Sequence, residues 1–533
     1  MKRSISCILT LLIITAATGQ ELNSIYDNNT LVSFEKYIYS TDSIFHTSVK
    51  PYFIPEMNRA FAYDSIIDSY DIERFSDRKA LNLIFNRNLV ELKKEDFGFT
   101  LDPLFDFGIG GDPENNRSYW INTRGFLAQG YIGKNVAFST SFYETQSKVP
   151  LWVNTYAASR GAVPGQGRYK GYGNDALDYA NASGYVSWSP GKHFNFQLGH
   201  GKQFWGDGYR SMMLSDFSLY HPYLMVSTNF WKIRYVNLYS QFTHPDLWYT
   251  AGGDLVYFKK YSTMHYLSYA PGKKWEISLF ESIVWQANDS TYKRGFDLSY
   301  INPVIFFRPV EVNNGSGDNE MMGMNLRFTA SKGIVLYGQF VIDEMKIKEF
   351  LSGDGWAGNK YAWQLGFRSF DLFKIKNLNL QAEYNLIRPY MYSHYNLVQS
   401  YSNAREPLAH PAGANTKEAV VIAKYNLRRL YFNARYVWEG TGLDESGINY
   451  GKNIFRNYQE APEQYGNHTG QGLYTTLNQM DMSVSYLVNP STNLNLYAGV
   501  TLRHEQNSAM DRRYTVLSFG IRTSLRNLYY DFY

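Results

Sequence analysis

A glycine-rich and aromatic stretch, GHGKQFWGDGYRSMMLSDF (199–217), holds side chains with several possible chemical roles. Trp and Tyr rings stack on the apolar faces of sugars, while charged and amide groups hydrogen-bond to hydroxyls or carboxylates. The residues that could line a glycan site or a polar lumen are Lys202, Gln203, Trp205, Asp207, Tyr209, Arg210 and Asp216. The G-x4-G-K-[ST] spacing of a phosphate loop is missing. The alternative to a glycan site is a structural segment whose glycines allow tight turns beside packed rings.

Serines and histidines are available throughout the chain, yet their spacing does not form a catalytic motif. The nearest cluster is Ser215, Asp216 and His221, and neither a nucleophile elbow nor an HExxH metal spacing occurs. The only cysteine is Cys7, so a chain that has lost its first twenty residues has neither thiol chemistry nor disulfides. We therefore predict a protein that is not an enzyme, with no catalytic residues, no metal site and no cofactor.

Regular alternation of apolar and polar residues dominates the second half of the chain. In LNLQAEYNL (378–386), the leucines, Ala382 and Tyr384 share one face, opposite Asn379, Gln381 and Glu383. The segments LYFNARYVWE and LNLYAGVTLR repeat this pattern. A period of two residues is typical of strands with one apolar and one polar face.

The connections between these strands are alternately short and long. Short links occur at 331–333, 373–377, 426–429 and 489–492, and long ones near 344–360, 388–417, 440–479 and 504–513. Short turns on one rim and long loops on the other are typical of outer-membrane barrels, and such long loops argue against a compact soluble domain. We predict an all-β fold over residues 96–533, a transmembrane antiparallel barrel of about 18 strands, within about 16–20.

Two segments, 200–232 and 296–322, interrupt the alternation. The second overlaps the stretch SYINPVIFFRPVEVNNGSGDNEMMG (299–323), in which Arg308 and Glu311 are three residues apart. We expect both segments to fold into the lumen and obstruct it. Polar groups inside a barrel need partners, and the expected polar network of the lumen consists of Asn122, Arg124, Glu281, Arg308 and Glu311.

The two ends of the chain resemble export and assembly signals. Residues 1–19 have a charged start, an apolar core and a small-residue cleavage site, which predicts a cleaved signal peptide. Residues 20–95 lack sustained alternation, so we expect a periplasmic extension or plug that is partly helical. A helix is predicted over Arg78–Lys94, with Leu81, Ile84, Phe85 and Leu92 on one side. The last strand, ending on Tyr533, resembles the aromatic signal by which outer-membrane barrels are recognised for insertion.

The composition favours a barrel and argues against nucleic acid as a partner. Aromatic residues make up 17% of the 533 residues, while the mean hydropathy is only −0.38. After the first twenty positions, no apolar run is long enough for a membrane-spanning helix. The formal net charge of +4 is too small to indicate nucleic-acid binding. The expected partners are outer-membrane lipid and lipopolysaccharide, surface polysaccharide and other outer-membrane proteins.

Five stretches carry a family resemblance when taken together: HTSVKPY (46–52), LDPLFDFGIG (101–110), NTRGF (122–126), the Gly199–Asp216 motif and the Asn302–Asn319 motif. The combination resembles the Wzi family of capsule-assembly proteins, and more closely its RemB-like gliding-motility branch in the Bacteroidetes. The resemblance implies an outer-membrane barrel of about eighteen strands with a helical part at its periplasmic mouth. It also implies a lectin without enzymatic activity that holds capsular polysaccharide on the cell surface.

The expected function is therefore the binding or anchoring of cell-surface polysaccharide. Two alternatives stay open: a structural subunit of a multi-protein complex for surface protein assembly, secretion or gliding motility, and a solute-conducting porin. The long loop at 440–479 contains several aromatic residues among Asn, Gly and Glu, a composition compatible with contact to a glycan or to a protein. These residues are Tyr450, Phe455, Tyr458, Tyr465 and Tyr474.

Overall fold

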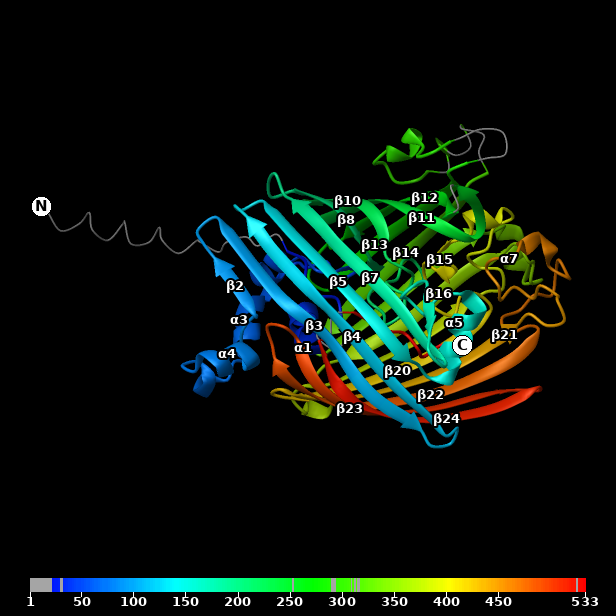
Figure 1. Ribbon diagram of the computed structural model, residues 1–533. Coiled ribbons are helices and arrows are strands. Elements are labelled where there is room, and N and C mark those ends of the chain that lie inside the picture. Colours follow the sequence, from blue (N-terminus) through cyan, green and yellow to red (C-terminus); the bar gives the residue numbers. More distant parts are fainter. Residues whose placement is uncertain are drawn as a thin grey trace, which may run out of the picture.

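Eighteen long antiparallel strands close into a barrel, as the alternation predicted (Figure 1). The computed structural model describes residues 22–28, 32–251, 254–288, 294–307, 309–310, 313, 317–523 and 526–533. The predicted signal peptide lies outside the described residues. The last strand pairs with the first long one, and Phe519 lies opposite Ile109 in this closing ladder.

The strands follow one another around the wall in chain order. They are β3 (Phe97–Asp112), β4 (Arg117–Ile132), β5 (Val136–Lys148), β7 (Ala176–Trp188), β8 (Phe194–Gly201), β10 (His221–Phe230), β11 (Ile233–Ala251), β12 (Asp254–Tyr269), β13 (Trp275–Gln286), β14 (Asn319–Ser331), β15 (Ile334–Glu344), β16 (Lys360–Ser369), β17 (Leu378–Ile387), β20 (Thr416–Leu427), β21 (Leu430–Leu443), β22 (Leu473–Asn489), β23 (Leu494–Asn507) and β24 (Met510–Thr523). Two short strands, β2 (Val90–Lys93) and β6 (Lys170–Tyr172), add to the edges of β3 and β7.

The two rims of the barrel differ in the length of their connections, as predicted. One rim, here called the short-turn rim, has tight connections such as 231–232, 332–333 and 428–429. The opposite rim, the long-loop rim, carries 149–175, 202–220, 287–318, 345–359, 388–415 and 444–472. The prediction of a long loop at 504–513 was wrong, because β23 and β24 are joined directly through residues 508–509.

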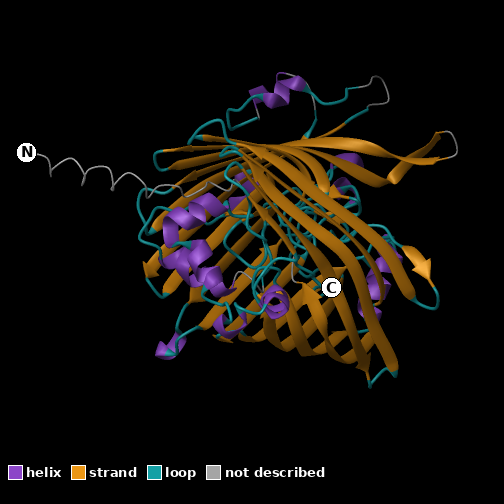
Figure 2. Cartoon of the chain, turned by 60° about the vertical axis from the view of Figure 1, so that its left-hand side comes forward, coloured by secondary structure: helices purple, strands orange, loops and turns teal. Residues whose placement is uncertain are grey.

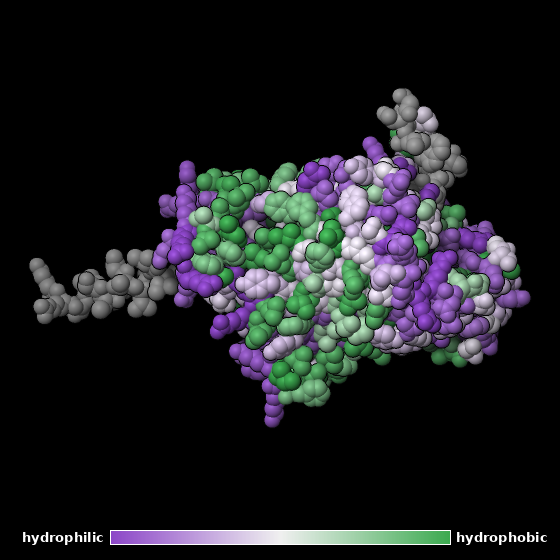
Figure 3. Space-filling model, turned by 60° about the horizontal axis from the view of Figure 1, so that its bottom comes forward, coloured by the Kyte–Doolittle hydropathy of each residue, from purple (hydrophilic) through white to green (hydrophobic). Residues whose placement is uncertain are grey.

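The predicted faces of the strands are confirmed where the alternation is regular. On β17, the amides and carboxylate of Asn379, Gln381, Glu383 and Asn385 are buried in the lumen. On β24, Leu517 and Phe519 are exposed on the outward face. Figure 3 shows apolar side chains gathered on the wall, with hydrophilic residues toward both ends of the molecule. This apolar band is the pattern that a barrel presents to a bilayer.

The N-terminal region, for which a partly helical extension is predicted, gathers helices at the short-turn rim (Figure 2). They are α1 (Val32–Ser40), α2 (Ile54–Phe61), α3 (Tyr63–Asp68), η1 (Glu73–Phe75) and α4 (Lys79–Phe85). Arg429, in a short turn, donates to the carbonyls of Tyr70 and Phe85 and so fixes the end of this region to the rim. Among the described residues, no helix is both long and apolar enough to cross a bilayer.

The helix predicted over Arg78–Lys94 is only partly present. It ends at Phe85, and Val90–Lys93 instead forms β2, in which Leu92 lies opposite Phe99 of β3. An Asn-Arg-Asn sequence follows Phe85, and Asn86 accepts from the amide of Ile72 and donates back to its carbonyl. This local side-chain bonding competes with helix propagation.

The chain was predicted to end on a strand, and this prediction was wrong. β24 ends at Thr523, and residues 526–533 turn back into the lumen, where Tyr529, Asp531 and Phe532 are buried. The aromatic end of the chain is therefore part of the interior of the barrel and not of its last strand.

The segment 296–322 was expected inside the lumen, and this prediction was wrong. Its described residues 296–307 lie on the outward face of β11, β12 and β13 (Figure 1, green, above the barrel). Tyr235 and Tyr239, which point outward from β11, donate to the carbonyls of Pro303 and Ile301. The alternation does break at this segment, but the chain there lies on the outward face of the wall and not in the lumen.

Candidate functional site

The segment between β8 and β10 enters the lumen, as predicted, and forms the centre of a plug. We use the name plug for residues 22–28, 47–52, 202–220 and 526–533, which meet inside the barrel. Within it, β9 (Phe204–Trp205) pairs with β1 (Val49–Lys50), and the Lys50 ammonium donates to the carbonyl of Gly206 at 2.7 Å. The N-terminal and central parts of the chain are thus joined inside the barrel.

Two glycines let this segment approach the barrel wall closely. Gly206 has a φ of +142°, and a Cβ there would lie 2.3 Å from the Nε2 atom of Gln339. A Cβ on Gly208 would lie 2.5 Å from the Oε1 atom of Gln364. The positive φ favours glycine at position 206, and a Cβ on Gly208 would also lie 2.6 Å from the backbone carbonyl oxygen of Arg210, which cannot turn away as a side chain can.

Arg210 is the most connected charge of the plug. Its guanidinium donates to Glu418 at 2.8 and 3.1 Å and to the Asp531 carboxylate at 3.3 Å, and all three side chains are fully buried. The Arg210 amide donates to Glu383 of β17 at 3.0 Å. Arg210 therefore ties the central segment to the wall and to the C-terminal tail, and its donors are directed at protein acceptors.

The two carboxylates that hold Arg210 have further partners. His410 lies 2.8 Å from Glu418, and Tyr209 donates its hydroxyl to Asp531 at 2.8 Å. Burial raises the pKa of Asp531, but the guanidinium groups of Arg210 and Arg435 hold it below its usual range. Paired and hydrogen-bonded charges of this kind are costly to separate.

Trp205 and Asp207 also lie in the packed interior. The Trp205 ring is fully buried, 5.3 Å from the ring centre of Tyr266 and 5.9 Å from that of Phe280. The Asp207 carboxylate accepts hydrogen bonds from Tyr39, Thr47 and Asn325. The structure thus gives both side chains protein partners and places neither on an open surface.

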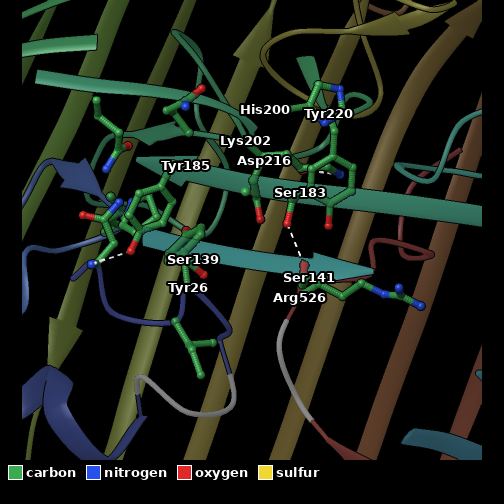
Figure 4. A pocket seen from close by; sticks show the side chains of 18 of the residues that line it. Tyr26, Ser139, Ser141, Ser183, Tyr185, His200, Lys202, Asp216, Tyr220 and Arg526 are labelled. Carbon is green, nitrogen blue, oxygen red and sulfur yellow. Dashed lines mark hydrogen bonds between the residues drawn. The ribbon is translucent and has the colours of Figure 1, made fainter. Parts of the chain in front are cut away.

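Lys202, Gln203 and Asp216 line a polar cavity beside the plug (Figure 4). The wall opposite them is formed by small residues of β5 and β7, and Ser141 and Ser183 lie 2.8 Å apart there. The cavity has a volume of about 180 Å³. For scale, a cavity of about 150 Å³ admits one benzene ring. The space is therefore sufficient for one small ring, with hydroxyl, amide and charged groups around it.

The Lys202 ammonium at this cavity is bound by backbone carbonyls. The Lys202 ammonium donates to the carbonyls of Gly165 and Asp216 at 2.7 and 3.0 Å, and lies over the ring of Tyr220. Burial lowers the pKa of Lys202, and the charges of Asp216 and Glu406 oppose that shift. Burial likewise raises the pKa of Asp216, which accepts from Tyr529 at 2.7 Å. Arg526 and Asn527 of the tail also line the cavity. They could not be predicted there, because the alternation before the tail predicts a strand to the end of the chain.

Comparison with solved structures identifies a similar barrel. The chain is similar to Wzi, described as an outer membrane protein involved in group 1 capsule assembly in Escherichia coli and as a carbohydrate binding β-barrel. The TM-score is 0.56 and the identity 12%, over 95% of this chain and 100% of that one. The two proteins share a fold. No family model matches the sequence, and no curated protein matches it.

More distant likenesses exist among porin-type barrels. OprD of Pseudomonas aeruginosa has a TM-score of 0.42 and 13% identity, over 79% of this chain and 94% of that one. OccAB2 of Acinetobacter baumannii has a TM-score of 0.42 and 10% identity, over 80% and 96%. At such TM-scores these likenesses say nothing specific about the present chain.

The lumen network expected from the sequence is not where it was predicted. Asn122 and Arg124 of β4 lie on its outward face, because the alternate residues, including Thr123 and Gln129, line the lumen cavities. Glu281 of β13 also lies outside the lumen, where it accepts from the amides of Phe306 and Phe307. Arg308 and Glu311 lie outside the described residues. The polar residues on these strands were assigned to the lumen only because they are polar.

The lumen network that the structure contains was largely missed. Its members are Glu276, Arg327, Gln339, Gln364, Arg368, Glu383 and Glu418. They come from β13 to β20, on faces that alternate with the exposed apolar residues. That alternation was the signal that could have located them.

The cluster Ser215, Asp216 and His221 is not assembled as a catalytic group. Ser215 donates to the carbonyl of Ala409 at 2.5 Å, Asp216 binds Tyr529 and Asn527, and His221 packs on the ring of Phe242. These three side chains thus have different neighbours.

Proposed function

We propose that this protein is a non-enzymatic outer-membrane barrel that binds surface polysaccharide through its long-loop rim. The short-turn rim would face the periplasm and the loops the outside, the usual orientation of such barrels. We include in this proposal membership of the Wzi-like family, with the RemB-like branch suggested by the sequence motifs. The partner lipid would be that of the outer membrane, including lipopolysaccharide.

The observation that carries the proposal is the occupied lumen. Arg210, Glu418 and Asp531 form a fully buried ionic group in the middle of the barrel. Conduction of solutes requires an open path through the pore, whereas a hydrogen-bonded plug lies in the interior of this barrel. This favours a binding protein over a general porin, and the carbohydrate-binding barrel with the same fold supports the choice of ligand.

The loops of the long-loop rim are braced by one another and by the plug. Arg388 donates to the carbonyl of Asn467 at 2.7 Å, and Asn415 donates to that of Gln471 at 2.9 Å. The amide of Ser215, in the plug, donates to the carbonyl of Leu408 at 2.8 Å. A preorganised surface loses less conformational entropy on binding than mobile loops would. In this proposal the segment 199–217 supports the binding surface from below.

Tyr465 is a suitable anchor for a sugar ring on that surface. It lies in the loop 444–472, and its side chain is 50% exposed, next to exposed Glu463 and Gln464. An aromatic face with neighbouring acceptors and amides is a common arrangement for sugar binding. Tyr37 of α1 is a matched control, because it is 44% exposed but lies at the opposite rim.

The test is the amount of polysaccharide that stays attached to intact cells of the native host. We expect a deletion strain to release surface polysaccharide into the medium, and a strain carrying Tyr465→Ala to release more than one carrying Tyr37→Ala. Equal amounts of each variant in the membrane fraction must be verified. If the deletion strain keeps as much polysaccharide as its parent, the proposal is wrong.

A second candidate function is a subunit of a larger outer-membrane complex. The observation that favours it is α7 (Ile347–Ser352), which exposes Ile347, Phe350 and Leu351 at the long-loop rim. Exposed apolar side chains that cluster in this way often mark a protein interface. Mild-detergent purification from the host tests it, because a partner should copurify with the parent chain and be lost with Leu351→Asp.

A further inference from the structure

The long connection between β13 and β14 forms a structure on the outside of the barrel. We call its described residues 294–307 and 309–310 the flap. Tyr235 and Tyr239 of β11 donate their hydroxyls to the carbonyls of Pro303, at 2.5 Å, and Ile301, at 3.0 Å. Glu281 of β13 accepts from the amide of Phe306 at 2.6 Å and from that of Phe307. The flap is therefore attached to β11 and β13, the two strands that flank β12 in the wall.

The flap lies at the level of the apolar band and not beyond the rim. Tyr239 lies opposite Leu224 of β10, which in turn lies opposite Leu198 of β8. Leu224 is exposed on the outward face, and Leu198 is 67% exposed. On the other side, Glu281 lies opposite Met322 of β14, which is exposed as well. The strands on both sides of the flap thus expose apolar residues next to the positions where the flap is attached.

The inner face of the flap is a small apolar core. Tyr300 and Phe307 are fully buried against Ile283 and Trp285 of β13. The Phe307 ring is stacked on His265 of β12 with a centroid distance of 4.5 Å. Tyr300 also donates to Asp318, next to the start of β14, at 2.7 Å. The packing covers the polar groups of His265 and Glu281, which would otherwise lie on the outward face.

The outer face of the flap is apolar. Leu298 is 75% exposed and Val304 is 63% exposed, and Ile301 and Phe306 are exposed too. A soluble loop would bury such residues or replace them with polar ones. Here they continue the band formed by Leu198, Leu224 and Met322 on the neighbouring strands.

Irregular backbone is normally excluded from the hydrocarbon layer, because unpaired amides and carbonyls are costly there. Several amides and carbonyls of the flap have side-chain partners that offset this cost. Glu281 accepts two of its amides, and the two tyrosines of β11 satisfy two of its carbonyls. Asn302 accepts from the amide of Val304 at 3.1 Å, and Asp297 from that of Ser299 at 3.0 Å. This accounts for a carboxylate on the outward side of a barrel strand.

We propose that the flap is an intramembrane element whose outer face, formed by Leu298, Ile301, Val304 and Phe306, contacts the acyl chains of the membrane. The inference rests on the proposed outer-membrane location. The occupant of this surface is lipid, since the flap continues an apolar band on both of its sides. Glu281, Tyr235 and Tyr239 act as the internal partners that allow irregular backbone at this depth.

Quenching by brominated phospholipids tests this contact. The only native cysteine is Cys7, so a full-length Cys7→Ser chain accepts a single fluorescent label at a chosen position. The label is placed at Val304→Cys on the flap, at Phe519→Cys on the outward face of β24, and at Ile448→Cys in an outer loop. Each protein is folded into phosphatidylcholine vesicles with bromine on the middle of the acyl chains, and into unbrominated vesicles.

We expect the labels at positions 304 and 519 to lose comparable fractions of their fluorescence in brominated vesicles. The label at position 448 should be equally fluorescent in brominated and unbrominated vesicles. Quenching at 519 without quenching at 304 would overturn the flap proposal and leave the barrel in the membrane. Absence of quenching at both positions, in a chain that still shows heat-dependent migration on gels, would instead contradict the membrane location.

Discussion

The plug segment 202–220 and the flap are two interruptions of the same alternating pattern, and they lie on opposite sides of the barrel wall. Both are rich in aromatic residues and follow a strand that ends at the long-loop rim. The plug segment finds its partners on the lumen face, at Glu383 and Glu418. The flap finds them on the outward face, at Tyr235 and Glu281. The side taken by an irregular segment is set by the face on which the strands offer hydrogen-bond partners.

The two segments also differ in the strength of their attachment. The plug is joined through buried, paired charges that are surrounded by protein. The flap is joined through the two tyrosines of β11, the Glu281 carboxylate and one ion pair, Arg294 with Asp318, and its outer face remains exposed. Loss of one attachment is therefore expected to cost more in the plug than in the flap, because removing one partner of a buried ion pair leaves an uncompensated charge.

The largest effect is expected for Arg210→Ala. This change leaves Glu418 and Asp531 buried without their shared cation, and should cost about 3–5 kcal/mol of the free energy of unfolding. The measurement is the temperature at which the folded band on a denaturing gel converts to the unfolded one. Arg513→Ala removes an exposed arginine of β24 and serves as the control. Equal conversion temperatures for the two variants would contradict a central role for Arg210.

Acid should release the helices at the short-turn rim. Burial raises the pKa of Glu35 in α1, but Arg368 outweighs it and lowers the pKa from 4.5 to about 2. The stabilisation from this carboxylate is present above the unfolded value and is lost as the pH falls toward 2. It amounts to about 3 kcal/mol. We expect the anisotropy of a dye at Tyr37→Cys, in the Cys7→Ser chain, to fall over this range.

Glu35→Gln identifies the group responsible for that transition. In this variant the dye should report the same mobility at neutral and acidic pH, at a level set by the weaker neutral hydrogen bond. A transition that persists unchanged in Glu35→Gln would assign the acid effect to another carboxylate.

Glu281→Ala should have a smaller and local effect. It leaves the amides of Phe306 and Phe307 without their acceptor, at a cost of about 1–3 kcal/mol. The flap should then open while the barrel stays folded, so a protease added to vesicles should cut within 294–310 more rapidly. Glu445→Ala, in an exposed loop, is the control. Flap cleavage that is no faster in Glu281→Ala than in Glu445→Ala would show that Glu281 does not hold the flap.

The smallest effect on stability is expected for Tyr465→Ala. Its side chain is half exposed, and substitutions at such positions usually change the free energy of unfolding by less than about 0.5 kcal/mol. The conversion temperature should therefore match that of the parent chain while polysaccharide retention falls. A large fall in conversion temperature would mean that Tyr465 supports the loops and does not serve mainly as a contact.

The strands could be predicted because a period of two residues is a local property of the sequence. The alternation within one segment predicts that Asn379 and Leu380 lie on opposite faces, and no information about other strands is needed. The faces of Asn122, Arg124 and Glu281 were assigned wrongly, because polarity alone does not fix the side of a strand when a loop or a solvated region covers the outward face. Glu281 is the clearest case, since its partners come from residues 306–307 of a connection that returns over the wall.

The interior site was predictable only in part. The segment 199–217 was expected in the lumen and lies there, yet its division into packed and cavity-lining residues depends on partners that are distant in sequence. Asp531 meets Arg210, and Asn527 meets Asp216, more than three hundred residues apart. Because the alternation predicts a strand, the departure of the chain from the wall after Thr523 could not be predicted.

The occupied lumen is tested most directly by planar-bilayer recording of the purified full-length protein. The plug, with its buried Arg210 group, should leave the bilayer with little stable conductance, while heat-dependent gel migration shows that the inserted protein is folded. Large, steady openings with a linear current–voltage relation from the unmodified protein would contradict the account and favour a porin.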